Sequence, residues 1–207
     1  ADSVYFFQSE EYAEVNAGVV IGTEMAAIID TLAYTEETAE IIKFVEEVHQ
    51  TPIKYVINTH YHADHTWGNC FFKNAEFIAH AKCKENLIKY GMPALEQVHK
   101  GNAFSDEVKI ILPDITFSQG RISLKLGKKT ITALPLPGHT NDNIGIFVEE
   151  DKVLFAGDTV MPVPYIVDGD IEETISSLES LPLMGIENIV QGHGEIILRG
   201  EVNGMAE

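Results

Sequence analysis

The residues best suited to chemistry are concentrated in one run, His60-Tyr61-His62-Ala63-Asp64-His65. Neutral imidazole and carboxylate groups are the ligands that Zn²⁺ and related borderline ions take up in proteins. A loop that holds three histidines and an aspartate would be costly to bury without a metal ion, because those polar groups would lack partners. The run therefore predicts one half of a metal site.

Three further ligand-type residues follow other predicted strands. They stand in the segments Pro137-Gly138-His139-Thr140, Gly157-Asp158-Thr159 and Gln191-Gly192-His193-Gly194. A glycine beside each of them lets the backbone turn sharply and approach a shared centre. Because loops at one end of a sheet are where ligands converge, we expect these side chains to meet the histidine run.

The elements that must position these residues alternate between strands and helices. Short apolar runs bounded by turn residues predict strands over residues 15–22, 25–30, 53–58, 75–80, 121–126, 129–134, 144–148, 153–156 and 189–190. Apolar residues at helical spacing predict helices over residues 35–50, 81–90 and 171–181, whereas residues 91–114 show a mixed pattern. This order predicts a layered α/β fold, with helices covering sheet faces, in a single domain over residues 1–207.

Composition narrows the classes of partner. The net charge of −18, from 32 acidic and 14 basic residues, repels phosphate backbones, so we expect a small-molecule substrate and no nucleic acid. No apolar run reaches the roughly 18–20 residues of a membrane span, so no membrane is expected either. Without a basic-then-apolar leader the expected location is cytoplasmic, or exported if a leader was removed before Ala1. Cys70 and Cys83 are expected to be reduced thiols. A homo-oligomer is compatible with the sequence.

The motifs quoted above, in this order along the chain, resemble those of the metallo-β-lactamase superfamily over about residues 15–193. The resemblance implies a four-layer αββα sandwich with the site at one edge. It implies a first metal on His60, His62 and His139, a second on Asp64, His65 and His193, and a bridging Asp158. The two divalent ions, zinc first and iron or manganese as alternatives, would share a hydroxide that acts as the nucleophile.

The residue at position 158 indicates a branch of that superfamily. Its aspartate is unlike the cysteine of true β-lactamases and resembles the glyoxalase II and lactonase branches. Strict glyoxalase II also carries a C-terminal helical extension that grips glutathione, and only a short stretch follows His193. The expected function is therefore a glyoxalase II-like metallohydrolase of an ester, thioester or lactone, with Asp64, Asp158 and Tyr165 as catalytic residues.

Several residues near these motifs have two interpretations. The Tyr165 hydroxyl could donate a hydrogen bond to a substrate oxygen, or its ring could only pack against the loop 162–167. Trp67 is a candidate for the pocket rim, and Phe71 and Phe72 are expected in the core. The remaining histidines match no motif and are expected at helix ends or on the surface: His49, His80 and His99.

Other activities of the same superfamily compete with hydrolysis of an ester, thioester or lactone. A mononuclear-iron persulfide dioxygenase resembles the same motif set but uses only His60, His62, His139 and Asp158. The number and identity of the bound metals would separate that oxidoreductase from a binuclear hydrolase. A phosphodiesterase or nuclease is disfavoured by the net charge, and a β-lactamase is disfavoured by Asp158.

Overall fold

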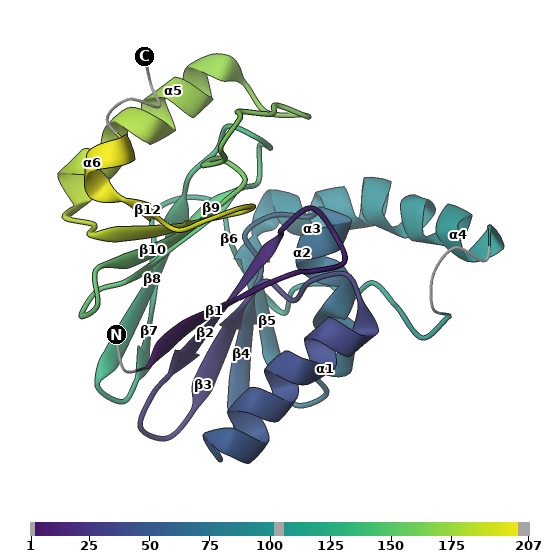
Figure 1. Ribbon diagram of the computed structural model, residues 1–207. Coiled ribbons are helices and arrows are strands. Elements are labelled where there is room, and N and C mark those ends of the chain that lie inside the picture. The colour runs from purple at the N-terminus through teal and green to yellow at the C-terminus, as the bar shows by residue number, and fades with distance from the viewer. Residues whose placement is uncertain (1–2, 102–105, 203–207) are drawn as a thin grey trace.

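Two β-sheets lie face to face at the centre of the computed structural model, which describes residues 3–101 and 106–202 (Figure 1). The first sheet has, in spatial order, the strands β1 (Val4–Gln8), β2 (Asn16–Ile21), β3 (Ala26–Ile29), β4 (Ile53–Ile57), β5 (Glu76–His80) and β6 (Ile115–Phe117). Strands β1 to β3 pair antiparallel, and β3 to β6 pair parallel. The parallel half delivers its carboxyl ends to one edge of the sheet.

The second sheet is arranged in a similar way. Its order is β12 (Ile197–Leu198), β11 (Asn188–Gln191), β10 (Val153–Gly157), β9 (Ile144–Val148), β8 (Lys129–Pro135) and β7 (Ile122–Leu126). Strands β10 and β11 are parallel, and the other neighbours are antiparallel. The predicted strands over 121–126 and 129–134 therefore do form a hairpin, which turns at Gly127.

Helices cover the outer faces of both sheets. The described helices are α1 (Thr35–Lys43), α2 (Ala63–Thr66), α3 (Ala81–Asn86), α4 (Met92–Lys100), α5 (Ile171–Ser180) and α6 (Arg199–Val202). Of these, α1 packs on the outer face of the first sheet and α5 on that of the second. Tighter or wider helical turns extend four of them, over Phe44–Val48, Trp67–Phe71, Leu87–Gly91 and Leu181–Met184. None of the helices described here is long and apolar enough to cross a membrane.

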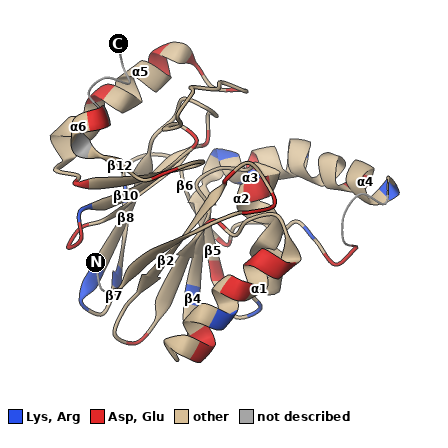
Figure 2. Cartoon of the chain, viewed as in Figure 1, with Lys and Arg blue, Asp and Glu red and all other residues tan. Residues whose placement is uncertain are grey.

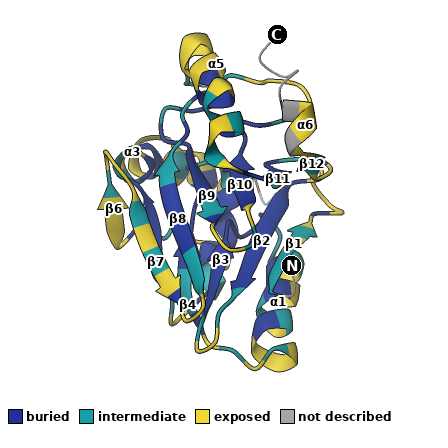
Figure 3. Cartoon of the chain, turned by 90° about the vertical axis from the view of Figure 1, so that its left-hand side faces the viewer, coloured by how far each residue is buried: buried dark blue, intermediate teal, exposed yellow. Residues whose placement is uncertain are grey.

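Three apolar layers hold the architecture together. Between the sheets, side chains such as Ile57, Ile78, Ile131 and Ile146 are fully buried. Figure 3 shows runs of buried residues along β2 and β8. On the outer face of the first sheet the core continues to α1, and on the outer face of the second it continues to α5. Because each sheet is covered on both faces, the central strands β3, β9 and β10 consist of apolar residues and glycine. The structure thus confirms the expected αββα sandwich.

The structure differs from the sequence prediction in several elements. The helix predicted over residues 81–90 continues through a wide turn at Leu87–Gly91 into α4, because Pro93 stands in the first turn of α4, where its missing N–H is tolerated. Much of the mixed stretch 91–114 is therefore helical, and residues 102–105 lie outside the described part. The prediction also missed the strands β1, β6 and β12, which are short or lack clear alternation.

The core between the sheets gives a test of the fold. Ile78 lies in β5 and is 0% exposed. We expect Ile78→Ala to lower the free energy of unfolding by about 2–5 kcal/mol, because it leaves a cavity that the two sheets cannot close. The measurement is urea unfolding of the metal-depleted protein. The control is Ile175→Ala on α5, which is 39% exposed and should cost less than about 1 kcal/mol. Equal losses would contradict the packing.

Candidate metal centre

Four strand ends and one helical turn bring the predicted ligands to a common edge of the sandwich. His60 follows β4, His139 follows β8, Asp158 directly follows β10 and His193 follows β11. One prediction is corrected here: the run from His62 to His65 is not loop throughout. Its residues Ala63–Thr66 form the short helix α2, and the Thr66 hydroxyl donates to the His62 carbonyl oxygen over 2.9 Å. This helical turn holds Asp64 and His65 on the side that faces the other predicted ligands.

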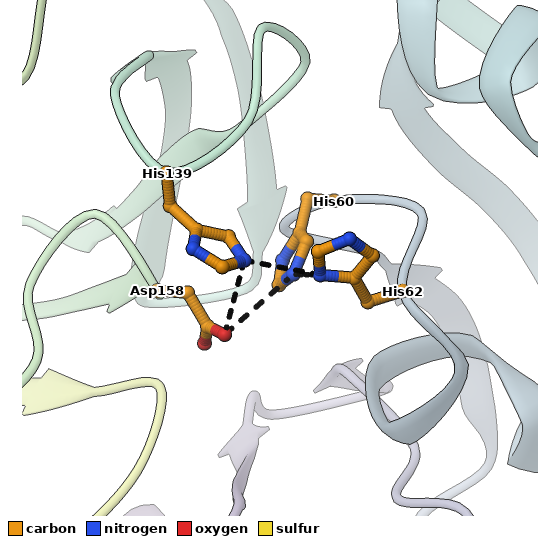
Figure 4. A group of neighbouring side chains, drawn as sticks. All are labelled: His60, His62, His139 and Asp158. Carbon is orange, nitrogen blue, oxygen red and sulfur yellow. Dashed lines mark hydrogen bonds and ion pairs between the residues drawn. The ribbon is translucent and has the colours of Figure 1, made fainter. Parts of the chain in front are cut away.

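The first group consists of His60, His62, His139 and Asp158, whose donor atoms lie within 4.8 Å of one another (Figure 4). The Nδ1 atom of His62 lies 3.0 Å from Nε2 of His60 and 3.0 Å from Nε2 of His139. The Oδ2 atom of Asp158 lies 3.8 Å from His60 Nε2 and 3.5 Å from His139 Nε2. Ligands around a tetrahedral zinc ion, at bond lengths of about 2.0–2.1 Å, lie roughly 3.3 Å apart. The spacing of this group fits such an ion.

The second group consists of Asp64, His65 and His193. The Oδ2 atom of Asp64 lies 3.6 Å from Nε2 of His65 and 3.4 Å from Nε2 of His193. Asp158 adjoins this group as well, because its Oδ1 lies 3.2 Å from His65 Nε2 and its Oδ2 lies 3.3 Å from His193 Nε2. The structure thus brings all seven predicted ligands together and places the Asp158 carboxylate between the two groups.

Nε2 of His65 and Oδ1 of Asp158 are both buried and face each other at 3.2 Å, yet neither forms a hydrogen bond of good geometry with a described residue. An unpaired buried nitrogen or carboxylate oxygen costs free energy, and native proteins keep such atoms for a ligand or an ion. Both atoms belong to types that bind Zn²⁺, Fe²⁺ or Mn²⁺. The donor set and its unsatisfied atoms therefore fit divalent cations.

The outer nitrogens of the rings are held by hydrogen bonds that leave the inner nitrogens free for an ion. Nδ1 of His139 donates to the Tyr165 carbonyl oxygen, and Nδ1 of His193 donates to the Ala13 carbonyl oxygen over 2.8 Å. Nδ1 of His65 donates to Asp30 Oδ2 over 2.8 Å. Such partners fix the tautomer and the orientation of a metal-binding imidazole, so the Nε2 lone pairs point into the centre.

Asp30 is a functional residue that the sequence prediction missed. Its Oδ1 accepts from the backbone N–H of Thr59 over 2.8 Å, and its Oδ2 accepts from the Thr59 hydroxyl over 2.6 Å. The Thr59 oxygen in turn lies 3.0 Å from Nδ1 of His60. One buried carboxylate therefore orients a histidine of each group. The sequence did offer one signal for Asp30, because it ends a predicted strand as Asp158 follows one. In the structure the backbone of Asp30 turns, with a φ angle of 57°.

Burial lowers the pKa of His60 and His62, whereas neighbouring carboxylates raise the pKa of His65 and His193. Burial, together with the nearby His65, holds the pKa of His60 well below its usual value. Burial and the adjacent His139 lower the pKa of His62 to about 4. These rings are thus neutral at pH 7, which is the form that binds a cation.

The second group carries protons when no cation is bound. Burial alone would lower the pKa of His193, but hydrogen bonds to Asp158 and Asp64 raise it to about 9. The same opposition, burial against Asp158, Asp64 and Asp30, leaves the pKa of His65 well above its usual value. A cation at the second group therefore displaces protons from these two rings, which makes its binding pH-dependent.

Two glycines give the ligands room. A Cβ atom on Gly192 would lie 1.7 Å from Oδ1 of Asp158, so no other residue fits beside the carboxylate as it stands. Gly157 has a φ angle of 58°, and a Cβ atom there would lie 2.6 Å from the side-chain oxygen of Asn143. The glycines flanking Asp158 and His193 in sequence thus serve close approach, as expected.

A cavity of about 470 Å³ opens over the metal centre. Its lining combines five of the predicted metal ligands with the residues Tyr12, Ala13, Ala63, Met161, Tyr165 and Val167. Tyr165 stays 65% exposed, and its ring centroid lies 6.1 Å from that of His139. Its backbone carbonyl therefore contacts a ligand, while its hydroxyl is available to a bound molecule.

The other residues singled out in the sequence have structural positions. Phe72 is buried in the core and Phe71 is partly buried, as expected. Trp67 is 8% exposed and lines a cavity beside the metal centre, so it both packs in the core and forms part of the cavity wall. His49 and His99 lie at helix ends, and the buried His80 caps the start of α3. Both cysteines are free thiols.

Solved structures share this fold. The chain aligns over its full length with a metallo-beta-lactamase from Pontibacter korlensis, at a TM-score of 0.81, 18% identity and 94% coverage of that chain. It also aligns over its full length with a metallo-beta-lactamase family protein from Thermus thermophilus, at a TM-score of 0.75, 18% identity and 79% coverage. Identities at this level establish the fold class alone.

The sequence establishes the family. Residues 13–193 match the model of the metallo-beta-lactamase superfamily, and the chain belongs to that superfamily. The hydroxyacylglutathione hydrolase GloC of Haemophilus influenzae is 30% identical over 196 residues, which cover 85% of this chain and 83% of that protein. Thioesterase pkgB of Emericella nidulans is 28% identical over 183 residues, covering 86% of this chain and 46% of that protein. The chain spans less than half of the length of several such relatives.

Close approach at Gly192 can be tested by substitution. We expect Gly192→Ala to displace the Asp158 carboxylate and to weaken zinc binding by about 10–100-fold, because Asp158 adjoins both groups. Isothermal titration with Zn²⁺ measures the affinity. The control is Gly200→Ala, where a Cβ atom meets nothing within 4 Å. Unchanged affinity in Gly192→Ala would contradict the assignment.

The role of Asp30 leads to a second prediction. Asp30→Asn keeps the shape of the side chain but removes the charge that orients His65 and, through Thr59, His60. We expect zinc affinity to fall by about 10–100-fold, with the second equivalent lost first. The same titration gives both stoichiometry and affinity. Two equivalents bound as tightly as in the unaltered protein would show that Asp30 serves only the fold.

Proposed function

We propose that this chain is a binuclear metallohydrolase, similar to glyoxalase II in its site, that cleaves an ester, thioester or lactone. The observation that supports it most is the Asp158 carboxylate, which lies within 3.8 Å of histidine nitrogens from both ligand groups. A carboxylate so placed can serve two cations at once, and paired cations about 3.5–4 Å apart are typical of hydrolytic centres.

The residues that would hold the cations divide as the two groups do. His60, His62 and His139 would hold one, and Asp64, His65 and His193 would hold the other. Zinc is the first choice for this mixed imidazole and carboxylate set, with iron and manganese as alternatives. When bound, such a pair lowers the pKa of water toward neutrality and polarises the carbonyl oxygen of the substrate.

The side chains of this chain contribute orientation and proton transfer. Asp64 is 15% exposed and its Oδ2 lies between Nε2 of His65 and Nε2 of His193, so one carboxylate oxygen can face the cation while the other accepts a proton from an attacking water molecule. Asp158 lies deeper, 5% exposed, and its negative charge holds the histidines of both groups in place. We assign the Tyr165 hydroxyl to a hydrogen bond with the substrate oxygen on which negative charge develops.

The substrate class draws support from the relatives. Two proteins of related sequence are named a hydroxyacylglutathione hydrolase and a thioesterase, and both names describe the cleavage of thioesters. An aspartate, rather than a cysteine, stands at the bridging position, which supports this branch over β-lactam hydrolysis. The high negative charge disfavours a polyanionic substrate such as a nucleic acid.

Metal content and turnover together test the proposal. We expect two zinc-like ions per chain by elemental analysis, and hydrolysis of at least one member of a panel of thioesters, esters and lactones. Removal of the ions with a chelator should abolish turnover, and added Zn²⁺ should restore it. Inactivity on the whole panel with two ions bound would refute the hydrolase. One iron per chain, with oxygen consumption on a persulfide, would establish the dioxygenase instead.

The role of Tyr165 has its own prediction. Tyr165→Phe removes the hydroxyl but keeps the backbone carbonyl that accepts from His139. We therefore expect unchanged metal content and a fall in kcat of about 10-fold or more, with little change in KM. Steady-state kinetics on the best substrate of the panel measures this. An unchanged kcat in this variant would contradict the role of the hydroxyl and assign the Tyr165 ring to packing against its loop.

A further inference from the structure

A second cavity adjoins the metal centre and shares part of its wall. It measures about 300 Å³ and is lined by Tyr12, Ala33, Tyr34, Ala63, Asp64, Trp67 and Val98. Tyr12, Ala63 and Asp64 also line the cavity over the metal centre. A molecule whose reacting group lies at the metal centre can therefore extend past Asp64 into the second cavity.

The walls of the second cavity are apolar and held in place by the core. Trp67 is 8% exposed and packs in one cluster with Leu95 and Val108, and Val98 of α4 packs against this cluster. Tyr12 stands at the rim and is 50% exposed. Preformed apolar cavities with few polar groups are the usual binding places for the non-reacting part of a ligand. The second cavity thus has the form of a substrate subsite.

Apart from the histidines of the metal centre, the charges around both cavities are all of one sign. Among the residues that the structure describes, neither lining contains a lysine or an arginine, and the acidic members are Asp64 and Asp158. Tyr34 also borders a third cavity, which is lined by five glutamates: Glu10, Glu11, Glu36, Glu37 and Glu40. Figure 2 shows acidic residues along α1, the helix that carries Glu36, Glu37 and Glu40. An anionic group in the second cavity would lose its hydration without meeting a cation, which is unfavourable.

On the basis of the proposed hydrolase function, we propose that the second cavity holds the non-reacting arm of the substrate, and that this arm is apolar and carries no negative charge. The preferred substrates are then uncharged aryl or alkyl esters, thioesters or lactones. Thioesters of glutathione, whose tripeptide carries carboxylates, are disfavoured. The selectivity resides in Tyr12, Tyr34, Trp67 and Val98, none of which belongs to either ligand group.

Binding can be measured without turnover, because Trp67 is the single tryptophan of the chain and lies in the cavity wall. Metal-depleted protein is titrated with phenylbutyramide and, separately, with phenylbutyrate, while tryptophan fluorescence is recorded. Metal depletion prevents the carboxylate from binding to a metal ion. We expect the amide to bind about 10-fold or more tightly than the carboxylate. Equal binding, or tighter binding of the carboxylate, would overturn the inference.

A matched pair of variants locates the subsite. Val98→Phe fills the cavity and should weaken the amide by about 10-fold or more, whereas Val48→Phe, at a residue 67% exposed in the turn after α1, should leave it unchanged. The thermal midpoint checks that both variants fold. If Val98→Phe does not, Tyr12→Ser at the exposed rim is measured instead and should weaken the amide as well. An unchanged affinity in the folded cavity variant would contradict the proposed location.

Turnover separates this inference from the proposed function. Metal-loaded protein is assayed on nitrophenyl esters of phenylbutyrate and of glutarate, whose free carboxylate makes its arm anionic. Preference for the phenylbutyrate ester supports both proposals. Cleavage of both esters at equal rates would overturn the subsite alone. Inactivity toward both esters and the remaining panel, while the amide still binds, would overturn the proposed hydrolase function. The proposed apolar binding site would then stand on the binding data alone.

Discussion

The structure depends on one buried carboxylate. Asp158 is 5% exposed and lies within 3.8 Å of a nitrogen on each of four histidines: His60, His65, His139 and His193. Without that negative charge, the burial of so many imidazoles at one edge would be strongly unfavourable. Burial alone would raise the pKa of Asp158, but in the absence of a cation the protonated His65 and the hydrogen bond with His193 hold it well below its usual value. The edge of the sandwich is thus organised around the Asp158 carboxylate, which the surrounding histidines keep ionised.

Much of this arrangement was predictable because the informative residues follow strands. The sequence run from His60 to His65, and the glycines beside His139, Asp158 and His193, mark ends of β-strands without knowledge of the fold. Parallel strands β3 to β5 and β10 to β11 then bring these ends to one edge. The prediction of convergence rests on that rule for His60, Asp158 and His193, and His139 reaches the same edge because β8 runs in the same direction as β10.

Other features depend on contacts that a sequence pattern does not encode. Asp30 resembles an ordinary turn residue until the pairing of β3 with β4 places it against Thr59. The helix through Pro93 continues because the preceding turn widens, which local propensity disfavours. The cavity beside Trp67 is formed by residues that are distant in sequence, Tyr12, Tyr34 and Val98, so only the packed chain defines it.

Two backbone carbonyls connect the metal centre with the loops that border the cavity above it. His139 donates to the carbonyl oxygen of Tyr165, and His193 donates to that of Ala13, and both loops also line the cavity. A change in loop sequence that alters which molecules enter will therefore also disturb the imidazoles beneath. When related proteins evolve toward new substrates, selection for the substrate and selection for metal binding therefore act on the same peptide groups, those of Ala13 and Tyr165. Loop remodelling then favours solutions that keep these two carbonyls fixed while the side chains around them change.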